Sequence, residues 1–128
     1  MDNVLIVDDD KDVIKVLEVI LPEHGFNTRG VSRSDEIFNI MPKFLPKVIL
    51  LDVNLEDEDG RFICNDLKTQ YLTKKIPVIL ISGNEKVKED VEYFMADDFI
   101  LKPIQIDVLV NRLKWFTDPS FFNLSPII

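Results

Sequence analysis

The 128-residue chain has one cysteine, 4 glycines and no long uninterrupted run of apolar residues. A lone cysteine, Cys64, cannot form an internal disulfide, which is typical of proteins in a reducing compartment. No apolar run approaches the roughly 18 residues that cross a bilayer. The N-terminus carries the acidic Asp2 and no basic residue in its first three positions, unlike the start of a signal peptide. We therefore expect a soluble, cytoplasmic domain with no membrane contact.

Basic residues are also scarce, with 15 Lys and Arg against 23 Asp and Glu and a net charge of −8. Nucleic-acid binding through phosphate contacts needs a basic face, so this charge balance argues against direct binding to nucleic acid. The acidic residues gather in two clusters, at 8–12 and 52–59. Each cluster directly follows an apolar segment. Since most acidic runs are only solvated surface, this position is what makes the two clusters informative.

Five short apolar segments alternate with five helical patterns, and a hydrophobic share of 46% is ample for one folded core. The predicted strands are 3–7, 26–31, 47–52, 77–82 and 98–101, and the predicted helices are 11–22, 34–42, 61–71, 85–95 and 106–116. Near-continuous apolar strands that alternate with helices predict a parallel sheet with helices on both faces. We expect an α/β fold: a five-stranded parallel sheet in the order 2-1-3-4-5, doubly wound as in flavodoxin, in three layers.

Polar residues mark the expected helix starts. Asp10 is placed to cap the first helix, with Asp12 as an acid in its first turn. Ser34 is placed to cap the second helix. Gly25 follows the first helix and can end it.

Carboxylates follow two strands that the predicted order places side by side. Asp8 and Asp9 follow the first strand, and Asp52 ends the third. In such sheets the site forms at the carboxyl ends of the strands, where the strand order reverses. Three carboxylates in one crevice repel one another unless a cation joins them, and oxygen ligands suit Mg²⁺. Ser82 and Lys102, at the ends of the fourth and fifth strands, would add a hydroxyl and a point cation.

In this order the motifs resemble the receiver domains of two-component response regulators, over about residues 3–116. The resemblance rests on Asp8-Asp9, on Asp52 with Asp59-Gly60 downstream, on Ser82-Gly83, and on the closing run from Ala96-Asp97 to Lys102-Pro103, whose last bond is usually cis in the family.

The resemblance implies that Asp52 accepts a phosphoryl group in a Mg²⁺-dependent reaction. Asp9 and Asp52 would hold Mg²⁺ by their side chains, Asp8 largely through water, and Asn54 by its main-chain carbonyl. Ser82 and Lys102 would bind the phosphoryl oxygens.

The same resemblance implies a switch and partners. Ser82 would move towards the phosphate and Phe99 would turn inward. These movements would remodel the face formed by 85–95, 98–101 and 106–116. The donor would be a histidine kinase or a phosphotransfer protein, and the remodelled face would bind an output partner or domain. A phosphorylation-dependent homodimer is compatible with this face. The domain itself would not be an enzyme, with at most slow self-dephosphorylation.

Three residues depart from the family pattern. Glu56 replaces a common proline, Phe99 lacks the hydroxyl of the commoner tyrosine, and Met95 stands where glycine is usual. None of these departures removes a residue that phosphorylation needs. We assign 1–116 to the receiver domain and 117–128 to a tail that either packs on the domain or begins a linker.

Three alternative functions fit part of the sequence. A calcium loop starting at Asp8 would need glycine and glutamate where Val13 and Val19 stand, so it is excluded. A haloacid-dehalogenase-type phosphatase would use Asp8 instead of Asp52 as the nucleophile, although Asp12 does not fit its motif and the chain is short. A receiver-like module that interacts constitutively, without phosphorylation, shares the fold and would leave the acidic crevice unused.

Overall fold

The computed structural model describes residues 1–120. Its elements, in chain order, are β1 (Asp2–Val7), α1 (Lys11–Glu23), β2 (Phe26–Val31), α2 (Ser34–Phe44), β3 (Val48–Asp52), α3 (Gly60–Thr69), β4 (Val78–Ser82), the 3₁₀ helix η1 (Glu85–Asp90), β5 (Asp98–Leu101) and α4 (Ile106–Thr117). The predicted strands are therefore found within one residue at each end. Of the predicted tail, 121–128 lie outside the described residues.

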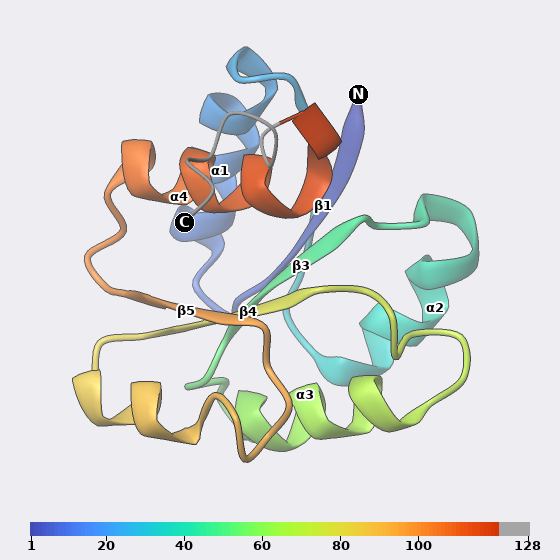
Figure 1. Ribbon diagram of the computed structural model, residues 1–128, viewed down its shortest axis with the longest axis vertical. Helices are drawn as coiled ribbons and strands as arrows, with labels where there is room; N and C mark the ends of the chain where they lie inside the picture. Colours follow the sequence, from blue (N-terminus) through green and yellow to red (C-terminus); the bar gives the residue numbers. More distant parts are fainter. Residues whose placement is uncertain (121–128) are drawn as a thin grey trace.

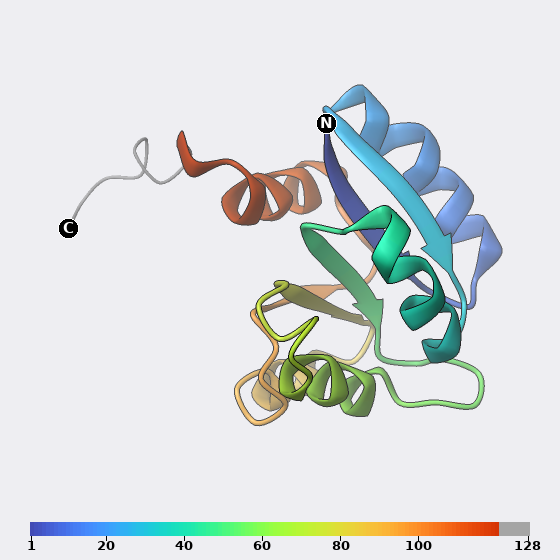
Figure 2. The ribbon, with the colours of Figure 1, turned by 90° about the vertical axis from the view of Figure 1, so that its right-hand side faces the viewer.

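The five strands form one parallel sheet in the order β2-β1-β3-β4-β5, which confirms the predicted fold. Figure 1 shows α1 and α4 on one face of the sheet and α2, α3 and η1 on the other. The side view in Figure 2 shows the sheet's twist. Neighbouring strands β1 and β3 run in register, with Val7 beside Leu51, so their carboxyl ends meet at one edge.

Two apolar clusters, one on each face, hold the layers together. Alternate residues of a strand point to opposite faces, so Leu5 belongs to one cluster and Ile6 to the other. The first cluster packs α2, α3 and η1 on the sheet, and the second packs α1 and α4. Burying each large aliphatic side chain contributes roughly 1.5–3 kcal/mol. The strands that carry the carboxylates are thus held from both sides.

The predicted capping residue is confirmed for α1 and is wrong for α2. Asp10 caps α1 as predicted, because its Oδ1 accepts hydrogen bonds from the N–H groups of Asp12 and Val13 at 2.9 and 3.4 Å. The prediction for Ser34 was wrong: it is the first residue of α2, and the capping position belongs to Arg33, which makes no side-chain cap. The Ser34 N–H and hydroxyl instead donate to Glu58, which lies in the loop after β3.

The predicted helix 85–95 is also corrected. Only Glu85–Asp90 is helical, and it is a 3₁₀ helix followed by a turn. Of these six residues only Val87 is buried, so the segment has little apolar packing to stabilise a longer helix. Met95, which replaces the family's usual glycine, adopts a left-handed backbone with φ of 63°.

No helix within residues 1–120 has both the length and the apolar character that a membrane span requires.

Gly60 allows α3 to begin directly against the end of β3. A Cβ at this position would lie 2.2 Å from the Asp52 carbonyl oxygen and 2.8 Å from the Val53 Cα, both of them backbone atoms. We expect Gly60→Ala to lower the free energy of unfolding by about 1–3 kcal/mol, although alanine is the better helix former. Gly83→Ala is the matched control, because no atom lies within 4 Å of its added Cβ. Urea denaturation measures both, and equal stabilities would contradict the predicted clash.

Candidate functional site

All the side chains that the sequence predicts to take part in the site, except Phe99, lie at the carboxyl edge of the sheet. Asp52 and Ser82 end β3 and β4, while Asp8 and Lys102 directly follow β1 and β5. Residues more than forty positions apart meet here because parallel strands all end at the same edge.

Three carboxylates form a group that could hold a metal ion. Asp8, Asp9 and Asp52 each offer one oxygen, and these oxygens all lie within 4.8 Å of one another. Asp8 and Asp52 are only 2% and 4% exposed, whereas Asp9 is exposed to solvent. A set of carboxylate oxygens that is open on one side suits a hard cation that keeps some of its water, such as Mg²⁺. The residues present therefore fit the predicted metal.

Lys102 ties the two buried carboxylates together. Its Nζ lies 2.7 Å from Asp52 Oδ2 and 3.5 Å from Asp8 Oδ2. Burial by itself would lower the pKa of Lys102, but its hydrogen bond to Asp52 and the charges of both aspartates raise it above the usual value. The ammonium group is therefore charged at neutral pH, and it partly compensates two negative charges.

Burial is the main influence on the charge of Asp8. Burial raises the pKa of its carboxyl to about 6, and the nearby charge of Asp52 adds to the rise. The hydrogen bond from the Asp10 N–H and the charge of Lys102 act in the opposite direction. Without a further cation, this carboxylate is ionised at neutral pH at a cost to the folded state.

Backbone N–H groups orient the two buried carboxylates. The N–H of Asp10 donates to Asp8 Oδ1, and the N–H of Asn54 donates to Asp52 Oδ1, both at 2.9 Å. In each carboxylate Oδ1 is thus held by backbone and Oδ2 faces Lys102. No motif in the sequence signals these contacts. They follow from the tight turns after β1 and β3.

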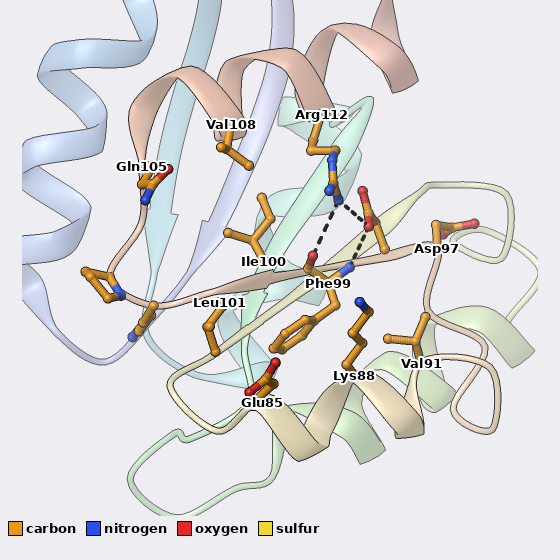
Figure 3. Close-up of a pocket in the computed structure, with 13 residues that line it drawn as sticks. Glu85, Lys88, Val91, Asp97, Phe99, Ile100, Leu101, Gln105, Val108 and Arg112 are labelled. Atoms are coloured by element: carbon orange, nitrogen blue, oxygen red, sulfur yellow. Dashed lines mark hydrogen bonds and ion pairs between the residues drawn. The ribbon is translucent and has the colours of Figure 1, made fainter.

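Ser82 and Phe99 lie on the adjoining strands. Ser82 is 1% exposed, and its hydroxyl accepts a hydrogen bond from the Asn84 N–H at 3.0 Å. Phe99 is half-buried on β5, and its ring extends towards Glu85 and Lys88 of η1 (Figure 3). It lines a groove of about 570 Å³ between η1, β5 and α4, which Lys102 borders and the three aspartates do not. The fold therefore places Phe99 in the neighbouring groove and not among Asp8, Asp9 and Asp52.

Two contacts around the loop after β3 were missed by sequence reasoning. Glu58 binds the N-terminus of α2, and Arg61 binds Asp90 of η1 at 2.7 Å. Both join elements that are far apart in the chain. No spacing or motif signals them.

The sequence and the fold both match a known family. The "Response regulator receiver domain" family matches residues 4–114, so the chain belongs to this family. It is a receiver domain of a two-component response regulator and takes part in signal transduction. The resemblance noted in the sequence is thereby confirmed, as is the Lys102-Pro103 cis peptide bond.

Curated relatives are longer than this chain. The chain is 30% identical over 114 residues to the transcriptional regulatory protein GltR of Pseudomonas aeruginosa, covering 88% of this chain and 47% of that protein. It is 34% identical over 116 residues to the putative response regulator NtrX-like of Rickettsia bellii, covering 88% and 24%. The chain thus spans half or less of the length of these relatives.

Solved structures agree over nearly the whole domain. A putative response regulator from Chloroflexus aurantiacus has a TM-score of 0.83 and 31% identity, covering 90% of this chain and 96% of that one. The BeF3-activated N-terminal receiver domain of Klebsiella pneumoniae RstA has a TM-score of 0.80 and 26% identity, covering 90% and 97%. The signal receiver domain of a signal transduction histidine kinase from Syntrophus aciditrophicus has a TM-score of 0.81 and 28% identity, covering 100% and 96%.

The raised pKa of Asp8 predicts a pH-dependent stability difference. Its contribution to stability is present below the unfolded value near 3.8 and is lost as the pH rises through about 6. An asparagine side chain in its place is neutral throughout, so Asp8→Asn should gain stability over the wild type between pH 4 and 7, on the order of 2 kcal/mol. Denaturation at several pH values in the presence of a chelator measures the difference. A constant difference across this range would contradict the prediction.

Proposed function

We propose that this domain accepts a phosphoryl group on Asp52 in a Mg²⁺-dependent reaction. One observation carries the proposal: the buried Asp52 carboxylate lies in a cluster with two further carboxylates and an ammonium group. A carboxylate with a purely structural role requires neither further carboxylates nor an ammonium group beside it. A carboxylate that becomes an acyl phosphate requires an ammonium group and carboxylates that can bind a cation, because the incoming phosphoryl group brings negative charge of its own.

In this reaction an Asp52 oxygen attacks phosphorus. The O–P bond forms while the bond from phosphorus to the donor's nitrogen breaks, and the electron pair leaves with the donor imidazole. The turn after β3 already orients Oδ1 through the Asn54 N–H. Lys102, which now contacts Oδ2, would transfer its contact to a phosphoryl oxygen and neutralise it. The role of each chain residue is thus to orient the nucleophile or to compensate charge.

Mg²⁺, when bound, neutralises charge on the phosphoryl oxygens. Asp9 and Asp52 would hold it by their side chains, Asp8 through water and Asn54 by its main-chain carbonyl. The mutual approach of the three carboxylates to within 4.8 Å supports this assignment for the aspartates.

The signal would leave through the face formed by η1, β5 and α4. Ser82 would move towards the phosphoryl group, and the ring of Phe99 would leave the groove beside η1 and turn inward. The position of Phe99 in that groove supports this path, because a change of rotamer there alters the surface directly (Figure 3). A phosphorylation-dependent homodimer through this face would be one form of output.

The partners follow from the receiver class. The donor would be a histidine kinase or a phosphotransfer protein, and the acceptor domain would do no more catalysis than slow self-dephosphorylation. Since the relatives extend well beyond the aligned region, an output domain or a separate output partner would read the switched face. A cytoplasmic location would suit phosphoryl transfer from such a donor to this domain.

Replacing the acceptor tests the central claim. Asp52→Asn should abolish the mass increase produced by a small phosphodonor with Mg²⁺, and also the binding of beryllofluoride, which mimics the phosphoryl group. Asp57→Asn is the matched control, because Asp57 is an exposed acid of the same loop and should leave both responses unchanged. Mass spectrometry and ¹⁹F NMR report the two responses. A wild-type protein that responds to neither reagent would favour the constitutive interaction module.

The position of the phosphoryl group separates the receiver from the phosphatase alternative. Borohydride reduces an acyl phosphate and marks the aspartate that carried it. After reaction with a phosphodonor, peptide mass spectrometry should find this mark on Asp52. Label on Asp8 would overturn the assignment and support the haloacid-dehalogenase-type chemistry.

A further inference from the structure

We propose that Arg61 is a positioning residue that couples the loop after Asp52 to η1, so that both respond together when Asp52 is phosphorylated. The inference rests on the proposed phosphorylation and adds a second route from the site to the switched face. The first route runs through Ser82 and Phe99. The second would run through the loop 53–59 and the guanidinium group of Arg61.

The Arg61 side chain joins two segments by a two-sided ion pair. On one side, Nη2 lies 2.6 Å from Asp59 Oδ2 and Nε lies 3.0 Å from Asp59 Oδ1, a fork-to-fork contact. On the other, Nη1 lies 2.7 Å from Asp90 Oδ2. All three side chains are about one-third exposed, at 32%, 30% and 34%. Partial burial makes these contacts stronger than those of a fully solvated pair.

An aromatic contact reinforces the side that faces η1. The Arg61 guanidinium lies 5.7 Å from the centre of the Phe94 ring, within the range of a cation–π contact. Phe94 also meets Phe62 edge to face, with ring centres 5.3 Å apart. The start of α3 therefore holds the segment 85–95 at both Asp90 and Phe94.

On the Asp59 side, a series of direct contacts connects Arg61 with Asp52. Asp59 caps α3 and forms a backbone bridge with Asn54. The Asn54 N–H in turn donates to Asp52 Oδ1 at 2.9 Å. The loop is also tied to the strand end, because the Gly60 N–H donates to the Val53 carbonyl at 2.8 Å. A phosphoryl group on Asp52 changes the acceptor that Asn54 contacts, and every later step is a direct contact.

The segment 85–95 has little apolar packing. Val87 is the one buried side chain of η1, and the hydrogen bond from the Val91 N–H to the Lys88 carbonyl is long, at 3.5 Å. By contrast, α4 buries Leu109, Val110 and Leu113. A segment with little apolar packing opens readily, so one ion pair and one ring contact make up a large share of what positions it.

The geometry requires arginine. Its planar group donates to Asp59 from two nitrogens and to Asp90 from a third, and lysine has one nitrogen. The pKa shifts agree with a strong contact: the hydrogen bond from Arg61 lowers the pKa of Asp59, and Asp59 and Asp90 raise the pKa of Arg61. Arg61→Lys therefore keeps the charge and loses the bridge.

Hydrogen exchange measured by mass spectrometry tests the coupling, with and without beryllofluoride and Mg²⁺. In the wild type, beryllofluoride should change exchange in both 52–60 and 85–95. In Asp90→Asn and Arg61→Lys, amides of 85–95 should exchange about fivefold faster in the free protein, as expected for loss of a partly buried charged contact. The beryllofluoride-dependent change in 85–95 should become smaller than in the wild type, because only the route through Ser82 and Phe99 is left, while the change in 52–60 persists.

The matched controls come from an exposed pair of the same type. Arg33 and Asp35 are 3.2 Å apart with 70% and 62% exposed side chains, so Arg33→Lys and Asp35→Asn should leave exchange in 85–95 unchanged. The double variant of Arg61→Lys and Asp90→Asn should match Arg61→Lys alone, because Arg61→Lys already removes the contact that Asp90→Asn breaks. Additive effects of the two substitutions would contradict a shared contact.

The outcomes separate the two proposals. If the wild type changes in 52–60 and the two variants still show the wild-type change in 85–95, the coupling through Arg61 is wrong while phosphorylation stands. A wild-type change confined to 52–60 would equally overturn the coupling. A wild type with no change in either segment would overturn the proposed phosphorylation, and with it the coupling.

Discussion

The site depends on the contact of the Lys102 ammonium group with both Asp8 and Asp52. Two buried carboxylates lie at the ends of neighbouring strands, and within residues 1–120 Lys102 is the cation that contacts both. Burial, and to a smaller extent the charge of Asp52, raises the pKa of Asp8 to about 6. A cluster with this charge excess favours the binding of a further cation, and the exposed Asp9 provides a side on which the cation can keep its water. The receiver chemistry that we propose uses this imbalance.

The strands that carry the carboxylates are tightly packed, whereas η1, which belongs to the face that would respond, has little packing. β1 and β3 are buried by apolar layers on both faces, so the ends that carry Asp8 and Asp52 are held in place. In contrast, η1 buries a single side chain and depends on contacts with α3. This contrast allows a small change at Asp52 to move a surface without disturbing the core.

Much of this arrangement could be predicted from the sequence, because it depends on periodicity and on strand ends. Apolar strands that alternate with helices imply the parallel order, and that order puts Asp8 and Asp52 at one edge. The failures have tertiary causes. Ser34 does not cap α2 because Glu58, 24 residues away, meets the helix start. The segment 85–95 forms a short 3₁₀ helix and a turn instead of a longer helix, because its apolar residues find little core to pack on.

The sequence by itself determined the sheet, the strand order and the set of oxygen and nitrogen groups at its carboxyl edge. It did so because hydrophobic burial follows a local pattern, and parallel strands then bring their ends together without further information. Only the tertiary structure decided how those groups are shared: which carboxylate is buried, which oxygen Lys102 contacts, and that Arg61 links Asp59 to Asp90. Such contacts depend on distances between residues far apart in the chain, and ion pairs follow no periodic signal along the sequence.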